Sequence, residues 1–203
     1  MQGIEAVLFE PVGCLAEFPA EPFHEMAARL SGRKKSASKS GSRSYWHLLN
    51  LMEAADKKPE SEDLELQAVA GATVYEDVIP ALSELKVMGV GLVIASSLSN
   101  IAVTHFLEAH GLCGFFSAVW NRDNAGGIKA VPLARASLNP ERTIFLTDTA
   151  EGLNVAKRAG LNAVLMMNDP DEARRLAMQE PAGGIVSLHE LPDFIRLVAA
   201  QRV

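Results

Sequence analysis

Residues 4–15 read IEAVLFEPVGCL, and the expected architecture follows from this stretch. The mostly apolar run Ile4–Phe9 predicts a buried strand. Glu10, Pro11 and Gly13 follow it, and a proline close to a glycine predicts a sharp turn. In open α/β sheets, ligands bind beyond the carboxyl ends of the strands, so the turn at Glu10 is the first candidate for a functional site.

Strand-like and helical segments alternate along the rest of the chain. Further apolar, β-branched runs predict strands over Gly91–Ala95, Ala118–Trp120, Thr143–Leu146 and Ala163–Met166. Helical spacing of apolar residues predicts helices over Val78–Leu85, Ile101–His110 and Gly152–Ala159. This alternation predicts an α/β fold: a Rossmann-like three-layer α/β/α core around a mostly parallel sheet.

Residues 18–71 interrupt this alternation and divide the chain into two parts. They predict helices over 21–31, 45–55 and 61–70, whereas residues 1–17 and 72–203 form the predicted core. The stretch SGRKKSASKSGSRS (31–44) carries five basic residues, six serines and no acid. We expect it to be a flexible solvated linker; a phosphate- or polyanion-contacting arm and a phosphorylation site are the alternatives.

Composition limits the class of protein. The apolar runs of this 203-residue chain are far too short to cross a bilayer, and no basic region precedes the first of them, so we expect neither a membrane partner nor a signal peptide. A net charge of −6 makes nucleic acid an unlikely partner. The two cysteines, Cys14 and Cys113, suit a reducing compartment, so we expect a cytoplasmic protein.

Polar residues that could contact phosphate or metal follow several of the predicted strands. Ser96 and Ser97 could bind phosphate oxygens with a hydroxyl and a backbone amide, although serines in such places are often helix caps. Asp148 offers a hard oxygen ligand for Mg²⁺, and Glu151 a second carboxylate. Lys129 could neutralise phosphate charge or be a plain surface lysine, and Glu10 could be catalytic or only a partly exposed residue capping a strand.

Four segments, taken in order, resemble the haloacid dehalogenase (HAD) superfamily of phosphatases and related hydrolases. They are IEAVLFEPVGCL (4–15), LVIASSLSN (92–100), GGIKAVP (126–132) and TIFLTDTAEGLNVAKRAG (143–160). The resemblance implies that residues 18–71 are a cap domain over the active site and that a small phosphorylated metabolite or phosphate is the ligand. It also implies catalytic positions at Glu10 and Lys129, phosphate contacts from Ser96, Ser97 and Lys129, and a Mg²⁺ site at Glu10, Asp148 and Glu151.

The first segment departs from the D-x-D-G-T pattern of that superfamily. Glu10 and Val12 replace the two aspartates, so the nucleophile position is lengthened by one methylene and the general acid/base is missing. Pro11 has no N–H to offer a phosphoryl group.

Whether the chain is an enzyme therefore stays open. The prediction is a HAD-like homologue with a degenerate motif, weakly active or inactive as a phosphatase, that keeps a phosphate- and Mg²⁺-binding pocket. One alternative is an active Mg²⁺-dependent phosphatase that uses Glu10 as its nucleophile; another is a partner-binding module without site chemistry. The sequence leaves the substrate and the oligomeric state undetermined.

Overall fold

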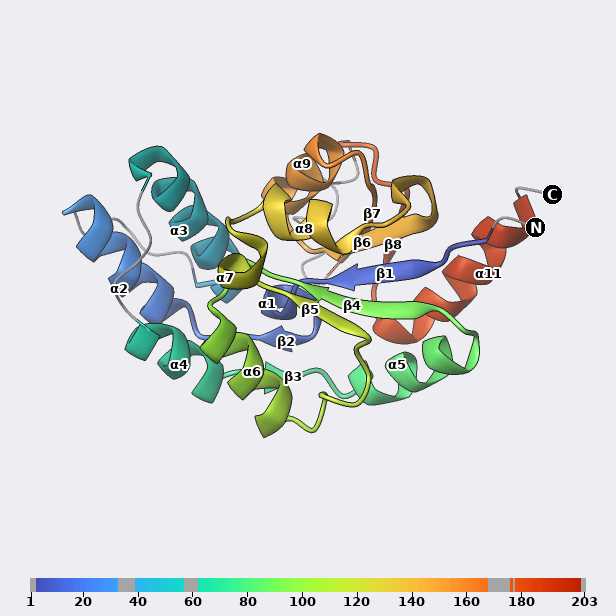
Figure 1. Ribbon diagram of the computed structural model, residues 1–203, viewed down its shortest axis with the longest axis horizontal. Coiled ribbons are helices and arrows are strands. Elements are labelled where there is room, and N and C mark those ends of the chain that lie inside the picture. Colours follow the sequence, from blue (N-terminus) through green and yellow to red (C-terminus); the bar gives the residue numbers. More distant parts are fainter. Residues whose placement is uncertain (1–2, 33–38, 57–61, 168–175, 177, 202–203) are drawn as a thin grey trace.

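A six-stranded parallel sheet forms the centre of the protein (Figure 1). The structure is a computed structural model that describes residues 3–32, 39–56, 62–167, 176 and 178–201. The strands lie in the order β5-β4-β1-β6-β7-β8, and every adjacent pair is parallel. Their bounds are β1 (Ala6–Phe9), β4 (Gly91–Ala95), β5 (Ala118–Trp120), β6 (Thr143–Thr147), β7 (Asn162–Met166) and β8 (Gly183–Ile185).

Helices cover both faces of this sheet, which confirms the predicted Rossmann-like α/β fold. Figure 1 shows α8 and α9 on one face and α5 and α6 on the other. The helices of this part are α1 (Pro11–Cys14), α5 (Val78–Val87), α6 (Asn100–Ala109), α7 (Arg122–Ala125), α8 (Ala130–Ala136), α9 (Ala150–Arg158) and α11 (Leu191–Gln201). Two 3₁₀ turns, η1 (Pro140–Arg142) and η2 (Leu188–Glu190), also lie among the described residues of this part.

The strand predictions are confirmed with small shifts at their ends. The first strand begins at Ala6 rather than Ile4, and β6 extends to Thr147. Strand β8 was not predicted, because two of its three residues are glycines and glycine has low strand propensity. A Cβ at Gly183 would lie 2.2 Å from the ring of Phe194, so the missing side chain allows α11 to pack against this edge strand.

Three helices form the insertion that follows the first strand. They are α2 (Ala20–Ser31), α3 (Gly41–Ala55) and α4 (Glu62–Ala70), as expected, and the short antiparallel strands β2 (Ala16–Glu17) and β3 (Thr73–Val74) flank them. Five aromatic side chains in successive ring contacts join α2 and α3 to α6 of the core: Trp46, Tyr45, Phe23, Phe18 and Phe106.

The expected flexible linker over 31–44 is wrong at both ends. Residue Ser31 ends α2, and α3 already begins at Gly41. Ser40 caps α3 by accepting a hydrogen bond from the Arg43 amide at 3.3 Å, so a serine that suggested a loop serves as a helix cap. The centre of the stretch, residues 33–38, lies outside the described residues.

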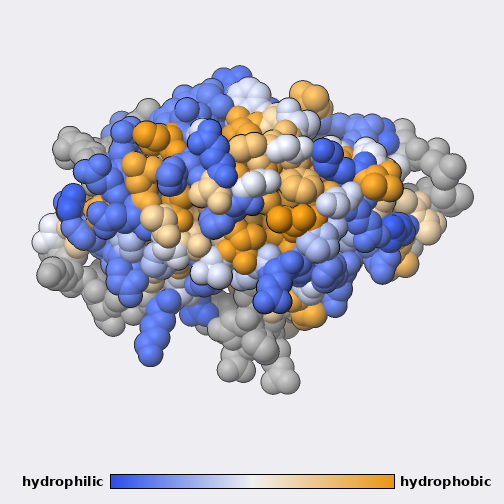
Figure 2. Space-filling model, turned by 90° about the horizontal axis from the view of Figure 1, so that it is seen from below, coloured by the Kyte–Doolittle hydropathy of each residue, from blue (hydrophilic) through white to orange (hydrophobic). Residues whose placement is uncertain are grey.

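The surface carries an apolar area on the face seen from below in Figure 1. Figure 2 shows apolar side chains near the centre of this face with hydrophilic ones around them. A hollow of about 420 Å³ lies between α4 and α6 and is lined by Asp63, Leu66, Gln67, Ala70, Ile101 and His105. Within the described ranges, no helix combines the length and apolarity needed to cross a membrane.

Candidate active site

The predicted site residues follow three neighbouring strands. Glu10 comes directly after β1, Ser96 and Ser97 after β4, and Asp148 after β6. Strand β1 pairs with both β4 and β6, so the carboxyl ends of the three strands meet at one edge of the sheet. Strand order reverses beside β1, which makes this edge the ligand-binding position of such folds.

The turn after β1 is shaped to receive Asp148. Gly13 has a φ of 84°, a conformation that residues with side chains rarely adopt. A Cβ at Gly13 would lie 2.3 Å from Oδ2 of Asp148, so only glycine leaves room for this carboxyl group. The Cys14 thiol donates to the Leu146 carbonyl at 3.3 Å and ties the turn to β6.

Glu10 is buried, with only 3% of its surface exposed, so the expectation of a partly exposed residue at the strand end is wrong. The Ser96 hydroxyl donates to Oε1 at 2.6 Å. The Tyr45 hydroxyl and the Ser97 amide donate to Oε2 at 3.0 and 3.4 Å. Burial outweighs these hydrogen bonds and raises the pKa of Glu10 to about 7.

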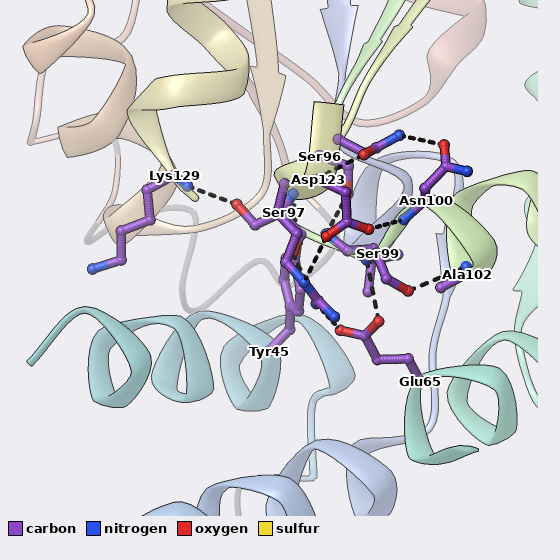
Figure 3. A network of polar contacts seen from close by, with 12 residues as sticks. Tyr45, Glu65, Ser96, Ser97, Ser99, Asn100, Ala102, Asp123 and Lys129 are labelled. Atoms are coloured by element: carbon purple, nitrogen blue, oxygen red, sulfur yellow. Dashed lines mark hydrogen bonds and ion pairs between the residues drawn. The ribbon is translucent and has the colours of Figure 1, made fainter. Parts of the chain in front are cut away.

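Tyr45 enters the site from α3 of the insertion (Figure 3). Its hydroxyl donates to Glu10 and accepts the backbone N–H of Ser97 at 3.0 Å. Burial raises the pKa of this hydroxyl well above its usual value, so it stays protonated and acts as both donor and acceptor.

The backbone of Lys129 lies beside Ser97, but its ammonium group contacts α3 instead of the serines. Its backbone amide donates to the Ser97 hydroxyl at 2.7 Å, while Figure 3 shows the side chain extending away from the serines. The ammonium donates to Oδ1 of Asn50 at 2.7 Å and Oε2 of Glu53 at 2.5 Å, both on α3. Within the described part of the chain, no hydrogen bond or ion pair joins it to Glu10. The hydrogen bond from Lys129 lowers the pKa of Glu53.

The predicted metal ligands differ in their burial and in their hydrogen-bond partners. Asp148 accepts a hydrogen bond from the Ser42 hydroxyl at 2.7 Å, and burial raises its pKa to about 7. Glu151 is exposed in the first turn of α9. Across the residues that the structure describes, no three His, Cys, Asp or Glu side chains could hold a metal ion together. Mg²⁺ is usually bound through one or two carboxylates and keeps several waters, so Glu10 and Asp148 are the described residues that could hold it.

A buried ion pair joins α4 to the same edge of the sheet. Arg122 of α7 contacts Glu65 of α4, and both side chains are at least 95% buried. Glu65 also accepts the Ser99 amide at 3.1 Å, and Arg122 donates to the Ser97 carbonyl at 3.4 Å.

Sequence reasoning missed the residues that the insertion contributes. These are Ser42, Tyr45, Asn50, Glu53 and Glu65, together with Arg122 of the core. The spacing of polar residues along α3 could have predicted a polar face of this helix. It could not have predicted which surface that face contacts.

Comparison with known proteins gives consistent results. The profile of the haloacid dehalogenase-like hydrolases matches residues 33–166. An enolase-phosphatase E1 from Gluconacetobacter diazotrophicus is 31% identical over 109 residues, which are 49% of this chain and 46% of that protein. The chain spans about half the length of the curated relatives that it matches.

Solved structures of this class share the fold. A predicted phosphatase from Clostridium acetobutylicum superimposes with a TM-score of 0.69 at 18% identity, over 95% of this chain and 98% of that one. A HAD phosphatase from Thermococcus onnurineus gives 0.63 at 20% identity, over 94% and 97%. Because the family profile covers well over half of the sequence, this chain belongs to the haloacid dehalogenase-like hydrolase family.

Proposed function

We propose that this member of the family is a non-hydrolysing homologue of its phosphatases. The observation that carries the proposal is the state of Glu10: each carboxyl oxygen accepts a hydrogen bond from within the protein, and the group is shielded from solvent. A nucleophile must reach the phosphorus atom with a free oxygen, and phosphoryl transfer depends on positioning and on cationic stabilisation. Glu10 is buried and enclosed by these partners, and the Lys129 ammonium is paired with Glu53 instead.

The neighbouring residues support the same proposal. Val12 cannot transfer a proton, and Pro11 cannot donate a backbone hydrogen bond. With a pKa of about 7, Glu10 is also about half protonated at neutral pH, which lowers the fraction of any nucleophilic carboxylate.

We propose that the loop after β4 keeps the features of a site for phosphate or a small phosphorylated metabolite. Enolase-phosphatase E1, the relative described above, is a phosphatase by name, and the serines after β4 keep a hydroxyl and an amide at the position where phosphate is bound in such sites. In this proposal residues 18–71 form the cap and residues 1–17 with 72–203 the core. We propose a cytoplasmic location from the two free cysteines, Cys14 and Cys113.

We propose that the natural protein does not use Mg²⁺, because burial favours the protonated, uncharged forms of Glu10 and Asp148. A magnesium titration of the protein followed by calorimetry tests this: we expect no saturable heat in the millimolar range. A saturable heat that is lost in Asp148→Asn would restore the metal site implied by the resemblance.

The deciding experiment is hydrolysis of an aryl phosphate and of acetyl phosphate in the presence of Mg²⁺. The natural protein is compared with Glu10→Gln, which keeps the size of the side chain and removes its nucleophilic charge. We expect equal rates at the background level. Turnover that disappears in Glu10→Gln would instead establish an active phosphatase with Glu10 as nucleophile.

A partner-binding module is the second candidate, and the hollow between α4 and α6 favours it. Leu66, Ala70 and Ile101 give the hollow an apolar floor, and Asp63 and His105 add polar groups. A folded Ile101→Asp variant that loses a partner retained by the natural protein would support this candidate, and it does not depend on the chemistry of Glu10.

A further inference from the structure

One stripe of α3 contacts three of the predicted functional groups. Ser42 donates to Asp148, Tyr45 to Glu10, and Glu53 accepts from Lys129. Residues 42, 45 and 53 follow the i, i+3, i+11 spacing that places side chains on one face of a helix. The helix therefore meets Asp148, Glu10 and Lys129 with a single surface.

Tyr45 takes the place of a ligand oxygen in this contact. Its hydroxyl accepts the N–H of Ser97 at 3.0 Å and lies within hydrogen-bond distance of Glu10. Backbone N–H groups that follow a strand bind the oxygens of tetrahedral anions in the same way. Tyr45 is 1% exposed, so no solvent competes for this position.

The cation that could attract an anion is also occupied. Lys129 is 4% exposed and donates to Asn50 and Glu53, while Glu53 lies 3.9 Å from Arg158 as well. The charge of Lys129 is thus neutralised by the helix that carries Tyr45.

We propose that α3 acts as an internal ligand: Tyr45 occupies the oxyanion position at Ser97, and Glu53 holds Lys129, so that the protein excludes phosphate by its own side chains. This inference rests on the proposed function, because it concerns the same site. It adds that the groups of a phosphate site, the Ser97 amide and the Lys129 ammonium, are still present and are covered by α3.

Apolar side chains hold α3 in the fold. The helix buries five large side chains, Tyr45, Trp46, Leu48, Leu49 and Met52. They pack mainly inside the insertion, against α2, and hold α3 in its place. The test therefore shortens a side chain at the site and does not require the helix to move.

The experiment measures binding of inorganic phosphate to Tyr45→Leu and Tyr45→Ala. Leucine keeps apolar contacts inside α3 but ends short of the tyrosine hydroxyl, so it opens the position at Ser97. We expect both variants to bind phosphate in calorimetry and to gain roughly 3–6 °C in melting temperature at ten times the dissociation constant. Adding Glu53→Gln, which removes the negative charge that neutralises Lys129, should tighten binding several-fold.

Leu49→Ala is the matched control, because Leu49 is equally buried on α3 and has no polar contact with the site. Phosphate also stabilises proteins through exclusion from their surfaces, so every shift is measured relative to this control. The natural protein and Leu49→Ala should show the same small shift and no saturable heat.

Two outcomes overturn the inference: a folded Tyr45→Leu that binds no phosphate, or a natural protein that binds it as tightly as the variant. If Tyr45→Ala does not fold, Tyr45→Leu carries the test alone. An assay of Tyr45→Leu with acetyl phosphate separates this inference from the proposed function. Turnover by the variant alone would support the internal ligand, whereas turnover by the natural protein would contradict the proposed function. A folded variant that binds no phosphate would contradict the internal ligand alone.

Discussion

Glu10 and Asp148 are two carboxyl groups in surroundings that favour their protonated forms. Burial raises the pKa of Glu10 from 4.5 and that of Asp148 from 3.8, each to about 7. The folded protein therefore binds these protons more tightly than the unfolded chain does. The free energy of unfolding is highest below the unfolded pKa values and falls as the pH rises through 7.

The pH dependence of stability is the first prediction. Glu10→Gln removes a titrating group and should lessen the loss of stability between pH 5 and pH 8. At about 1.4 kcal/mol per pH unit, the difference reaches roughly 3 kcal/mol at pH 8 in favour of the variant. Urea unfolding at three pH values measures it, with the exposed Glu151→Gln as control. Parallel pH profiles for Glu10→Gln and the natural protein would contradict the prediction.

The second prediction concerns the pair Thr147 and Gly152. A Cβ at Gly152 would lie 1.8 Å from the Thr147 hydroxyl oxygen. Gly152→Asp should therefore destabilise the protein by more than about 2 kcal/mol through steric overlap. Thr147→Gly in the same molecule should recover part of that loss, because it removes the overlapping atoms. A double-mutant cycle by denaturant unfolding measures the coupling, and strictly additive effects would contradict the steric explanation.

Helices α3 and α4 join the insertion to the core by different means. The first uses hydroxyl, amide and carboxyl groups that meet the predicted site, and the second uses the buried pair of Glu65 with Arg122. Removal of one partner of a buried ion pair strongly lowers the free energy of unfolding, because the other partner stays buried with an uncompensated charge. Replacement of both partners by apolar residues of similar size changes the stability little.

The third prediction applies this to α4. Glu65→Leu alone should destabilise the protein by about 3–5 kcal/mol, since Arg122 stays buried without its partner. The double variant Glu65→Leu with Arg122→Met should return close to the stability of the natural protein. Thermal and urea unfolding of the three proteins measure both steps. A double variant as unstable as the single one would show that the pair contributes more than its charge.

The protein as a whole differs from the superfamily pattern in its first motif, and α3 also covers its site. Substitutions can change these two features independently. Restoring only the motif leaves α3 in place over Glu10 and Lys129. Opening the site without the motif leaves no acid/base group.

The fourth prediction follows from this separation. Glu10→Asp, Pro11→Leu and Val12→Asp together should remain inactive toward acetyl phosphate, because Tyr45 still occupies the site. Adding Tyr45→Leu should raise hydrolysis above background. Circular dichroism checks that both variants fold, since Val12 is fully buried and an aspartate there carries a desolvation cost. Activity in the triple variant alone would show that α3 does not block the site.

Strand and helix patterns predicted five of the six strands of the core sheet. Buried parallel strands are nearly continuous apolar runs, so Gly91–Ala95 and Ala118–Trp120 were predicted with their observed bounds. The same logic placed Glu10, Ser96 and Asp148 after strands, and a parallel sheet brings such positions to one edge. Local sequence therefore determines which residues of the core reach the site.

Only the tertiary structure decided which side chains of the insertion contact the predicted site residues. Ser42, Tyr45 and Glu53 contact Asp148, Glu10 and Lys129 across separations of 106, 35 and 76 positions. Such contacts depend on how α3 packs against the sheet, and helical periodicity shows that a face exists but not which surface it covers. The hydrogen bond from Tyr45 to Glu10 and the ion pair of Lys129 with Glu53 have the same origin. Both result from the packing of α3 against the core, and the sequence of α3 does not show which surface it covers.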